Sequence, residues 1–341
     1  MVKRPEVMVI GRVSVDFYPD RIGAPLSEAT SFAPAVGGTS ANVAVAAARL
    51  GHHAQLVTKI GSDPLGEYVL AALQRHGVDA SAVARHPSLA TPVVFAELNP
   101  PTAPSIWFYR EPSAPDSHLT LDDVDLALAA DVDVLWIPGG TLAFEPSAST
   151  VRTVLASRRR KRHTVLDLDY RPMFWTSAAE AGAAKRSLIE QVTVVVGNVE
   201  ECLVTVGTSD PHLAADRLLE AGVELAIVKM GADGVMGKSA DGTTVVVEPS
   251  PVEVVCGLGA GDAFGGSLIH GLLTGAPLRE TLTRANAAGA IVAARLSCSD
   301  EMPTPAEIDS MLATGIAPPR LHMGRAPDER ERTPTTGSGT L

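Results

Sequence analysis

A glycine-rich turn leading into an apolar helix is the segment of this sequence best suited to chemistry. It reads GLGAGDAFGG at residues 257–266, where Gly257, Gly259 and Gly261 allow the amide N–H groups to point into one space. Free N–H groups and the positive end of a helix dipole attract an anion. The Asp262 carboxylate can accept a proton from an attacking hydroxyl while the amides stabilise a transferred phosphoryl group. For an isolated Gly-x-Gly-Asp motif, however, helix capping by the Asp is the commoner explanation.

Two widespread phosphate-binding motifs do not account for this segment. The pattern GxGxxG fails after Gly257 because its third glycine position is Asp262. A Walker A loop fails at residues 237–239 because Ala232 occupies the position of its first glycine. A phosphate site at residues 257–266 therefore belongs to neither group.

Two polar residues near the N-terminus, Asn42 and Asp16, suit the hydroxyl groups of a sugar. The segment GGTSANVAVAAARLG begins at Gly37 and Gly38 and places Asn42 in the first turn of an expected helix. An Asn amide both donates and accepts hydrogen bonds, as neighbouring hydroxyls require. Asp16 follows the first expected strand, where its carboxylate can accept hydrogen bonds from vicinal hydroxyls. The structural alternatives are a loop with a packing helix for residues 37–51 and turn initiation for Asp16.

Two arginines beside aromatic residues provide donors for an anion. Arg110 lies in IWFYREP and Arg171 in LDLDYRPMFW, and both follow expected strands. A guanidinium matches a carboxylate or phosphate with two parallel hydrogen bonds. A surface salt bridge is the alternative for either arginine.

Acidic and amide side chains follow two further expected strands. They form a candidate magnesium site, in which water molecules link the side chains to the ion. The competing explanation is that Asn198 caps a helix. The group comprises Asp167, Asp169, Asn198, Glu200 and Glu201.

Short β-branched runs alternate with Ala- and Leu-rich helical stretches along the chain. This alternation predicts an α/β fold with a mostly parallel sheet covered by helices on both faces, in which ligands bind at the carboxyl ends of the strands. The expected strands are 7–10, 55–59, 134–137, 164–168, 193–196 and 225–229, and the expected helices are 40–50, 66–76, 147–159, 211–221, 262–273 and 278–295.

Two stretches interrupt the alternation and predict a small β lid over the site. Residues 12–36 and 91–118 are richer in Pro and aromatics and contain short alternating runs. The polar tail at 317–341 is expected to be disordered. The main domain accordingly spans residues 1–316.

Composition restricts the class of partner. The 341 residues carry 28 Lys and Arg against 39 Asp and Glu, a formal charge of −11, which argues against nucleic acid and anionic membranes. The basic run at 158–163 is accordingly interpreted as a solvated helix end. Three widely spaced cysteines, Cys202, Cys256 and Cys298, and the lack of long apolar runs indicate a soluble, cytoplasmic protein without disulfides or a membrane span.

In this order, the motifs resemble the ribokinase-like (PfkB-type) carbohydrate kinases over residues 7–312. The resemblance rests on the Gly37-Gly38 helix with Asn42, on Asn198-x-x-Glu201, on Lys229-x-Gly231-x-x-Gly234 and on the segment 259–262. It implies ATP and Mg²⁺, with Asp262 as the base and an anion hole formed by the amides of Gly259, Ala260 and Gly261. The other implied roles are sugar binding for Asp16, Gly37, Gly38 and Asn42, binding of a substrate carboxylate or phosphate for Arg110 and Arg171, the magnesium and phosphate site for Asn198 and Glu201, and the nucleotide side for Lys229, Gly231, Gly234 and Asn286.

Five stretches resemble the subgroup that phosphorylates the primary hydroxyl of 5-dehydro-2-deoxygluconate in myo-inositol catabolism: FYREPSAPD, VLDLDYRPMFW, VVVGNVEEC, GLGAGDAFGG and ANAAGAIVAARL. Alternatives are a kinase of 2-dehydro-3-deoxygluconate or another sugar, and a non-catalytic sugar- or nucleotide-binding protein. Members of the family often pair as homodimers through their lid sheets. Cys256 stands where relatives usually have Asp or Asn, in a region that in many of them helps bind a monovalent cation. This departure weakens the expectation of potassium activation.

Overall fold

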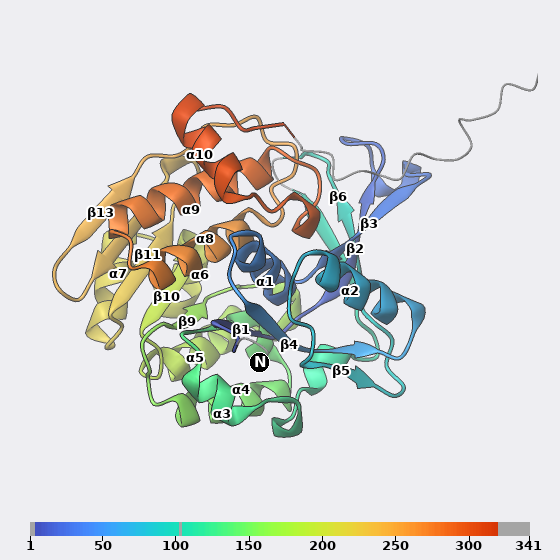
Figure 1. Ribbon diagram of the computed structural model, residues 1–341, viewed down its shortest axis with the longest axis horizontal. Coiled ribbons are helices and arrows are strands. Elements are labelled where there is room, and N and C mark those ends of the chain that lie inside the picture. The colour runs from blue at the N-terminus through green and yellow to red at the C-terminus, as the bar shows by residue number, and fades with distance from the viewer. Residues whose placement is uncertain (1–3, 102–103, 320–341) are drawn as a thin grey trace, which may run out of the picture.

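A large sheet with helices on both faces forms the body of the molecule (Figure 1). The computed structural model describes residues 4–101 and 104–319. The sheet order is β13-β12-β11-β10-β9-β8-β1-β4-β5, parallel from β11 to β5, with β12 and β13 antiparallel at one edge. The predicted α/β class with a mostly parallel sheet is confirmed. Its strands are β1 (Val7–Ile10), β4 (Ala54–Gly61), β5 (Val83–His86), β8 (Val134–Pro138), β9 (Thr164–Asp167), β10 (Val194–Asn198), β11 (Leu225–Lys229), β12 (Val235–Ser239) and β13 (Thr244–Val247).

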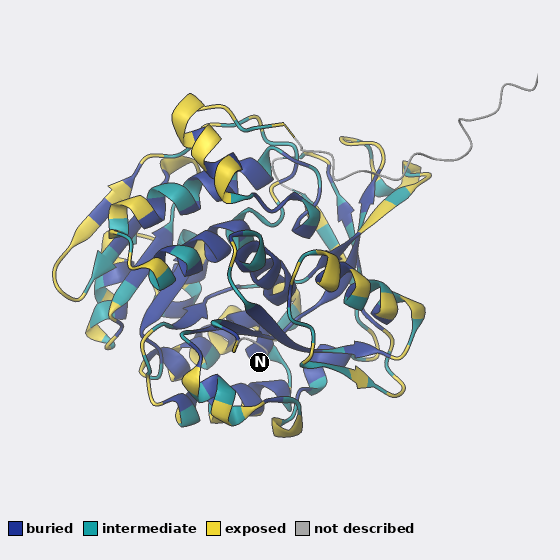
Figure 2. Cartoon of the chain, viewed as in Figure 1, coloured by how far each residue is buried: buried dark blue, intermediate teal, exposed yellow. Residues whose placement is uncertain are grey.

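Two apolar cores lie on opposite faces of this sheet. Along β1, Val7 and Val9 enter one core while Met8 and Ile10 enter the other, as the alternation of side chains along a strand requires. Each core lies between one face of the sheet and one layer of helices. Figure 2 shows the buried residues of the sheet and helices in dark blue. One layer contains α1 (Thr39–Arg49), α2 (Pro64–Arg75), α8 (Ala260–Thr274), α9 (Leu278–Ala293) and α10 (Pro305–Thr314); the other contains α3 (Leu126–Asp131), α4 (Ser147–Arg158), α5 (Ala178–Ile189), α6 (Val199–Val206) and α7 (Pro211–Glu220).

A second, four-stranded sheet stands beside the large one (Figure 1). Its order is β3-β2-β6-β7. Three of its strands fall within the stretches 12–36 and 91–118, and β3 extends one residue beyond the first stretch. They are β2 (Ser14–Pro19), β3 (Phe32–Gly37), β6 (Val93–Glu97) and β7 (Ser105–Tyr109). Asp16 lies within β2, so the alternative that it initiates a turn is wrong.

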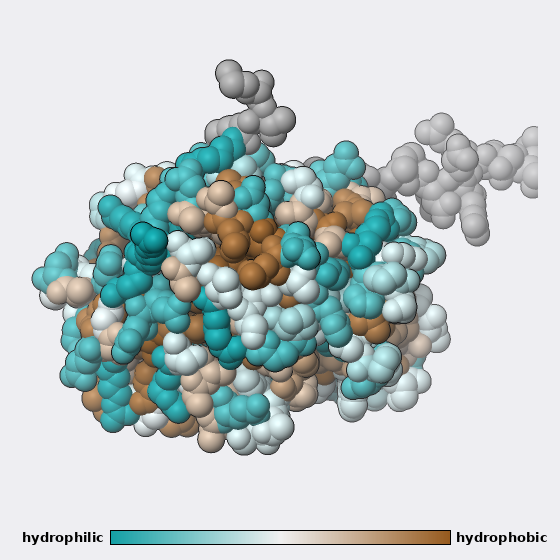
Figure 3. All heavy atoms as spheres, turned by 90° about the horizontal axis from the view of Figure 1, so that it is seen from below, coloured by the Kyte–Doolittle hydropathy of each residue, from teal (hydrophilic) through white to brown (hydrophobic). Residues whose placement is uncertain are grey.

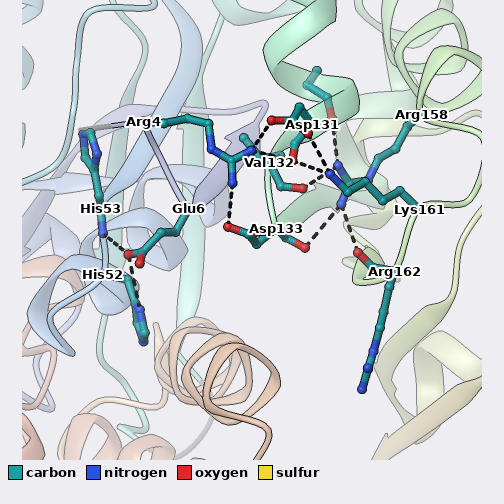
Figure 4. A network of polar contacts seen from close by, with 11 residues as sticks. Arg4, Glu6, His52, His53, Asp131, Val132, Asp133, Arg158, Lys161 and Arg162 are labelled. Carbon is teal, nitrogen blue, oxygen red and sulfur yellow. Dashed lines mark hydrogen bonds and ion pairs between the residues drawn. The ribbon is translucent and has the colours of Figure 1, made fainter. Parts of the chain in front are cut away.

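Arg158, the first residue of the basic run, is buried rather than solvated. Its guanidinium donates to the carbonyl oxygens of Ala129 and Val132 at 2.8 and 2.9 Å and to Thr164 at 2.7 Å, as Figure 4 shows in part. The interpretation as a solvated helix end is therefore wrong for Arg158, because the side chain satisfies carbonyls that would otherwise be buried without donors. Lys161 does lie at the surface, where it pairs with Asp131.

The surface mixes polar and apolar residues, as the face in Figure 3 shows. Within the described residues, no helix is long and apolar enough to cross a bilayer. Of the tail predicted to be disordered, residues 320–341 lie outside the described part of the chain, whereas Ala317, Pro318 and Pro319 line a surface cavity.

Candidate active site

Two cavities meet at the N-terminus of α8, at the carboxyl ends of the parallel strands. The smaller cavity, about 60 Å³, lies between the large sheet and the second sheet, and the larger one, about 650 Å³, lies beside β11 and α9. The smaller cavity is lined by Arg12, Asp16, Gly38, Asn42, Arg110, Arg171, Gly259 and Asp262; the larger by Lys229, Gly231, Gly234, Ala260, Gly261 and Asn286.

Asp262 does not cap α8. The N-cap is Gly259, whose φ of 80° is a left-handed conformation that a glycine adopts without strain. Asp262 lies in the first turn, and its carboxylate accepts a hydrogen bond of 2.7 Å from Asn42 Nδ2. Ser299 donates to Asn42 Oδ1 at 2.7 Å and so orients the amide. The capping explanation is therefore wrong, and Asp262 faces the cavity.

Burial raises the pKa of Asp262 to about 6, while the hydrogen bond from Asn42 and the charges of Arg171 and Lys229 oppose the rise. A carboxyl group with this pKa is ionised at neutral pH and remains basic enough to accept a proton from a hydroxyl in a transition state. The arrangement can therefore supply a general base.

Asp16 occupies the same cavity from β2. Ser14 Oγ donates to its carboxylate at 2.6 Å, and burial raises the pKa of Asp16 to about 7. A Cβ at Gly37, the position paired with Ser14 across β2 and β3, would overlap the Asp16 carboxyl group. Glycine at position 37 therefore leaves the space that the Asp16 side chain occupies.

Lys229, at the end of β11, brings positive charge to the larger cavity. Burial opposes its charged form, but Asp167, Glu201 and Asp262 together raise the pKa of Lys229. Its Nζ lies 3.2 Å from the point where a Cβ of Gly261 would stand, directly beneath the glycine-rich turn. The turn, the α8 N-terminus and Lys229 thus form one anion-binding corner between the two cavities.

The family model for pfkB family carbohydrate kinases matches residues 4–305 of the sequence. The chain belongs to this family. The kinase is 31% identical over 309 residues to a 5-dehydro-2-deoxygluconokinase of Clostridium beijerinckii, covering 89% of this chain and 91% of that protein. It is also 31% identical over 315 residues to a 5-dehydro-2-deoxygluconokinase of Geobacillus thermodenitrificans, covering 90% and 93%.

Solved structures share the fold of the kinase. A PfkB protein from Polaromonas superposes with a TM-score of 0.80 at 26% identity, over 90% of this chain and 99% of that one. An E. coli protein described as a ribokinase II, in complex with ATP and Mg²⁺, gives a TM-score of 0.82 at 25% identity, over 91% and 99%. The protein is therefore a sugar kinase of the pfkB family with a ribokinase-like fold.

Asn198 and Glu201 form a capping box at the start of α6 in this kinase. Asn198 Oδ1 accepts from the Glu201 backbone at 2.8 Å, and Glu201 Oε2 accepts from the Asn198 backbone at 2.7 Å. The other Glu201 oxygen accepts from the Tyr170 backbone at 3.2 Å. Capping by Asn198, the competing explanation, is thus present in the structure. The described residues contain no cluster of three or more His, Cys, Asp or Glu arranged to hold a metal directly.

The two predicted arginines both reach the smaller cavity but differ in their partners. Arg110 donates to both oxygens of buried Asp116 and lies 5.5 Å from the ring of Phe174, so its charge is already balanced. Arg171 is 38% exposed, and its Nε lies 3.5 Å from an oxygen of Asp169. Asn286, on the nucleotide side, donates its amide to the Glu248 carbonyl at 2.8 Å.

Arg12 is a cavity residue that the sequence analysis missed. It lies two residues after the end of β1, lines the smaller cavity, and forms an ion pair with Asp169. The available signal was its position at the carboxyl end of a buried strand, where other site residues were expected. Arg12 was not predicted as a site residue because it belongs to no recognisable motif.

Removing the amide of Asn42 tests its contact with Asp262. We expect Asn42→Ala to move the acidic limb of kcat/KM to higher pH by about one pH unit, the effect of losing a hydrogen bond to a charged group. The sign follows because the hydrogen bond favours the ionised base, whose loss on acidification ends activity. A pH–rate profile measures the shift. A uniform loss of activity with an unmoved limb would assign Asn42 to sugar binding alone.

Proposed function

We propose that the protein is an ATP-dependent kinase that phosphorylates the primary hydroxyl of 5-dehydro-2-deoxygluconate. The observation that carries the proposal is the smaller cavity, where a candidate base, Asp262, shares the walls with the guanidinium groups of Arg12, Arg110 and Arg171. Arg110 is paired with Asp116, but Arg12 and Arg171 share the single carboxylate of Asp169. A sugar acid supplies a second carboxylate for these two guanidinium groups, whereas a neutral sugar does not. The names of the relatives in Clostridium and Geobacillus support the same substrate.

In the proposed reaction, the larger cavity takes ATP and the smaller one takes the sugar acid. The substrate oxygen attacks the γ-phosphorus, the bond from that phosphorus to the leaving ADP oxygen breaks, and the hydroxyl proton passes to Asp262. The amides of Gly259, Ala260 and Gly261 serve as the anion hole. Lys229 lies beneath Gly261, where its charge stabilises the transferring group.

The acidic residues beside Lys229 fit a magnesium ion held through water. Burial raises the pKa of the Asp167 carboxyl well above its usual range. The nearby charges of Glu201, Asp169 and Asp262 raise this pKa further. A cation near this group relieves the repulsion and, when bound, neutralises the phosphates of ATP. Asn198 and Glu201 would hold the ion from their capping box. Cys256 is buried, and burial raises the pKa of its thiol, so it brings no charge for a monovalent cation.

ADP release with Mg-ATP tests the proposal. The purified protein is assayed for kcat/KM with 5-dehydro-2-deoxygluconate, 2-dehydro-3-deoxygluconate, ribose and fructose. Preference for the first acid supports the proposal. Preference for 2-dehydro-3-deoxygluconate would make that acid the substrate instead. Preference for a neutral sugar would contradict the proposal that the arginines bind a substrate carboxylate. If no ADP is released with any of the four compounds, the result would favour a non-catalytic sugar- or nucleotide-binding protein.

The outer face of the second sheet suits pairing with a second copy of the chain. Along β7, Ile106 and Phe108 line the smaller cavity, whereas Trp107 and Tyr109 point away from it and are 54% and 60% exposed. We expect a homodimer that Trp107→Glu converts to a monomer, measured by sedimentation equilibrium, because the substitution buries a charge in the interface. Leu203→Glu, at a similarly exposed position on α6, is the control and should leave the dimer intact. A monomeric wild-type protein would contradict the expectation.

Dependence on ATP and three free cysteines support a location in the cytoplasm.

A further inference from the structure

Two arginines at the smaller cavity share one carboxylate. Arg12 donates through Nη2 to Asp169 Oδ2 and, at 2.9 Å, to Thr39 Oγ1. The other oxygen of Asp169 lies 3.5 Å from Arg171 Nε. Arg12 is only 5% exposed and stacks 4.9 Å from the centre of the Phe174 ring, which fixes the plane of its guanidinium. The group therefore carries two positive charges and one negative charge.

The backbone of Asp169 and the space beside Gly140 accommodate the ion pair between Arg12 and Asp169. Asp169 has a φ of 27°, a left-handed value that is unusual for a residue with a side chain. A Cβ at Gly140 would stand 2.5 Å from Asp169 Oδ2 and 3.1 Å from Arg12 Nη2, so only glycine leaves room for the ion pair. Burial would raise the pKa of Asp169, but Arg12 and Arg171 hold it below its usual value. The carboxylate is therefore charged, and it accepts from Thr39 Oγ1 at 3.4 Å as well as pairing with the two arginines.

Unused donors remain on Arg12. Among the described residues, Nη1 makes no hydrogen bond and Nε is buried without an acceptor. Arg110 differs, because both of its Nη nitrogens donate to Asp116 and Nη2 also donates to Ser117. The acids that share the cavity, Asp16 and Asp262, accept from Ser14 and Asn42 rather than from either arginine. Within the Arg12–Asp169–Arg171 group, one carboxylate therefore serves two guanidinium groups, while Glu201, Asp262 and Asp167 act on Arg171 from outside the group.

We propose that Arg12 is a specificity-determining residue that binds the carboxylate of the sugar-acid substrate, with Arg171 as its partner. This inference rests on the proposed function, since it assumes an anionic substrate. A bound carboxylate completes the charge balance of two guanidinium groups and two carboxylates and accepts from the free Nη1. Asp169 positions both guanidinium groups, and Arg110 supports the wall of the cavity through Asp116.

The test compares Arg12→Lys and Arg12→Gln with the wild type on a sugar acid and on fructose. We expect kcat/KM for the acid to fall about 10- to 100-fold, mainly through KM, the effect of losing hydrogen bonds between charged groups. KM for ATP and kcat/KM for fructose should change less than kcat/KM for the acid, so the preference for the acid over fructose should decrease. Arg85→Gln, which removes an exposed arginine paired with Glu67, is the matched control and should behave as the wild type.

Removing Arg12 leaves Asp169 buried without its main partner and can unfold the protein. The double variant Arg12→Gln/Asp169→Asn removes both charges, and calorimetric binding of the acid without ATP gives a readout independent of turnover. Weak acid binding by a folded double variant supports the inference. Equal losses on acid and fructose, or a loss confined to ATP, would overturn it.

The wild-type panel separates this inference from the proposed function. If 2-dehydro-3-deoxygluconate is the better substrate, the proposed substrate fails, but the role of Arg12 stands when its variants lose that acid selectively. If 5-dehydro-2-deoxygluconate is preferred and the Arg12 variants retain the preference, the inference fails alone.

Discussion

Replacing Asp262 with Asn is expected to lower kcat by at least about 100-fold, the contribution of a general base. The Asn side chain keeps the shape of Asp, and its oxygen can still accept from Asn42, so the cavity and nucleotide binding should persist. Only the ability to take the hydroxyl proton is lost. Single-turnover ADP formation at saturating substrates, with ATP affinity measured separately, isolates this step. Asp210→Asn, at the N-cap of α7, is the control, because Asn is an equally good cap. Undiminished turnover in Asp262→Asn would remove the assigned role.

The same variant should be more stable than the wild type at pH 8. Burial raises the pKa of Asp262 to about 6 in the folded state, so folding favours the protonated carboxyl. The free energy of unfolding of the wild type therefore decreases as the pH rises through this range, by an amount on the order of 1–3 kcal/mol. The variant does not lose this stability, because its amide stays neutral. Thermal unfolding at pH 4 and pH 8 measures the effect, which should be absent at the lower pH. A stability difference that is equal at both values would contradict a charge-based origin.

The sequence allowed prediction of the edge of the sheet at which the site lies, because parallel strands end at a common edge. Lys229, Arg171 and the segment beginning at Gly257 each follow a strand or open a helix, and they line the two cavities. The strand at 7–10 was predicted with its observed bounds, because it is a short buried run of apolar residues. The helix predicted at 278–295 begins at the predicted residue but ends two residues earlier, at Ala293. Sequence spacing therefore predicted which elements line the two cavities.

Pairing between side chains distant in sequence was not predictable. Asn42 was expected to meet the sugar, yet it bonds to Asp262, 220 residues away. Arg12 and Asp169 are 157 residues apart, and neither belongs to a motif that names the other. Arg110 lies only six residues from Asp116, but a 3-10 turn at Pro115–His118 is needed to bring the carboxylate back to it. Such contacts depend on the packing of separate elements, for which one sequence has no local signal.

Lys229→Met is expected to reduce kcat/KM for ATP by about 100-fold, since a buried charge next to a transferring phosphoryl group acts mainly in the transition state. Lys229 lies among Asp167, Glu201 and Asp262, and no hydrogen bond fixes its Nζ within the described residues. Its charge is therefore available to the phosphates of the nucleotide, and its loss also exposes each carboxylate to the other two. The pKa of Asp262 should rise as a result, because Lys229 is among the groups that lower it. The acidic limb of the pH–rate profile should then move to higher pH, together with the fall in kcat/KM.

Lys238→Met separates this role from a general effect of removing a lysine. Lys238 lies on the neighbouring strand β12 and pairs with Asp216 at the surface, so its loss should change neither ATP kinetics nor the acidic limb. Stability adds a second readout: Lys229→Met should destabilise the protein more at pH 8 than at pH 5. Burial raises the pKa of Asp262 to about 6, so this carboxyl is ionised at pH 8 and needs the lysine there, whereas it is mostly protonated at pH 5. An unchanged KM and kcat for ATP with a pH-dependent stability loss would assign Lys229 to the charge balance of the fold alone. A loss of ATP kinetics with the shifted limb would place one lysine at the junction of both cavities, where it serves the base and the phosphoryl group together.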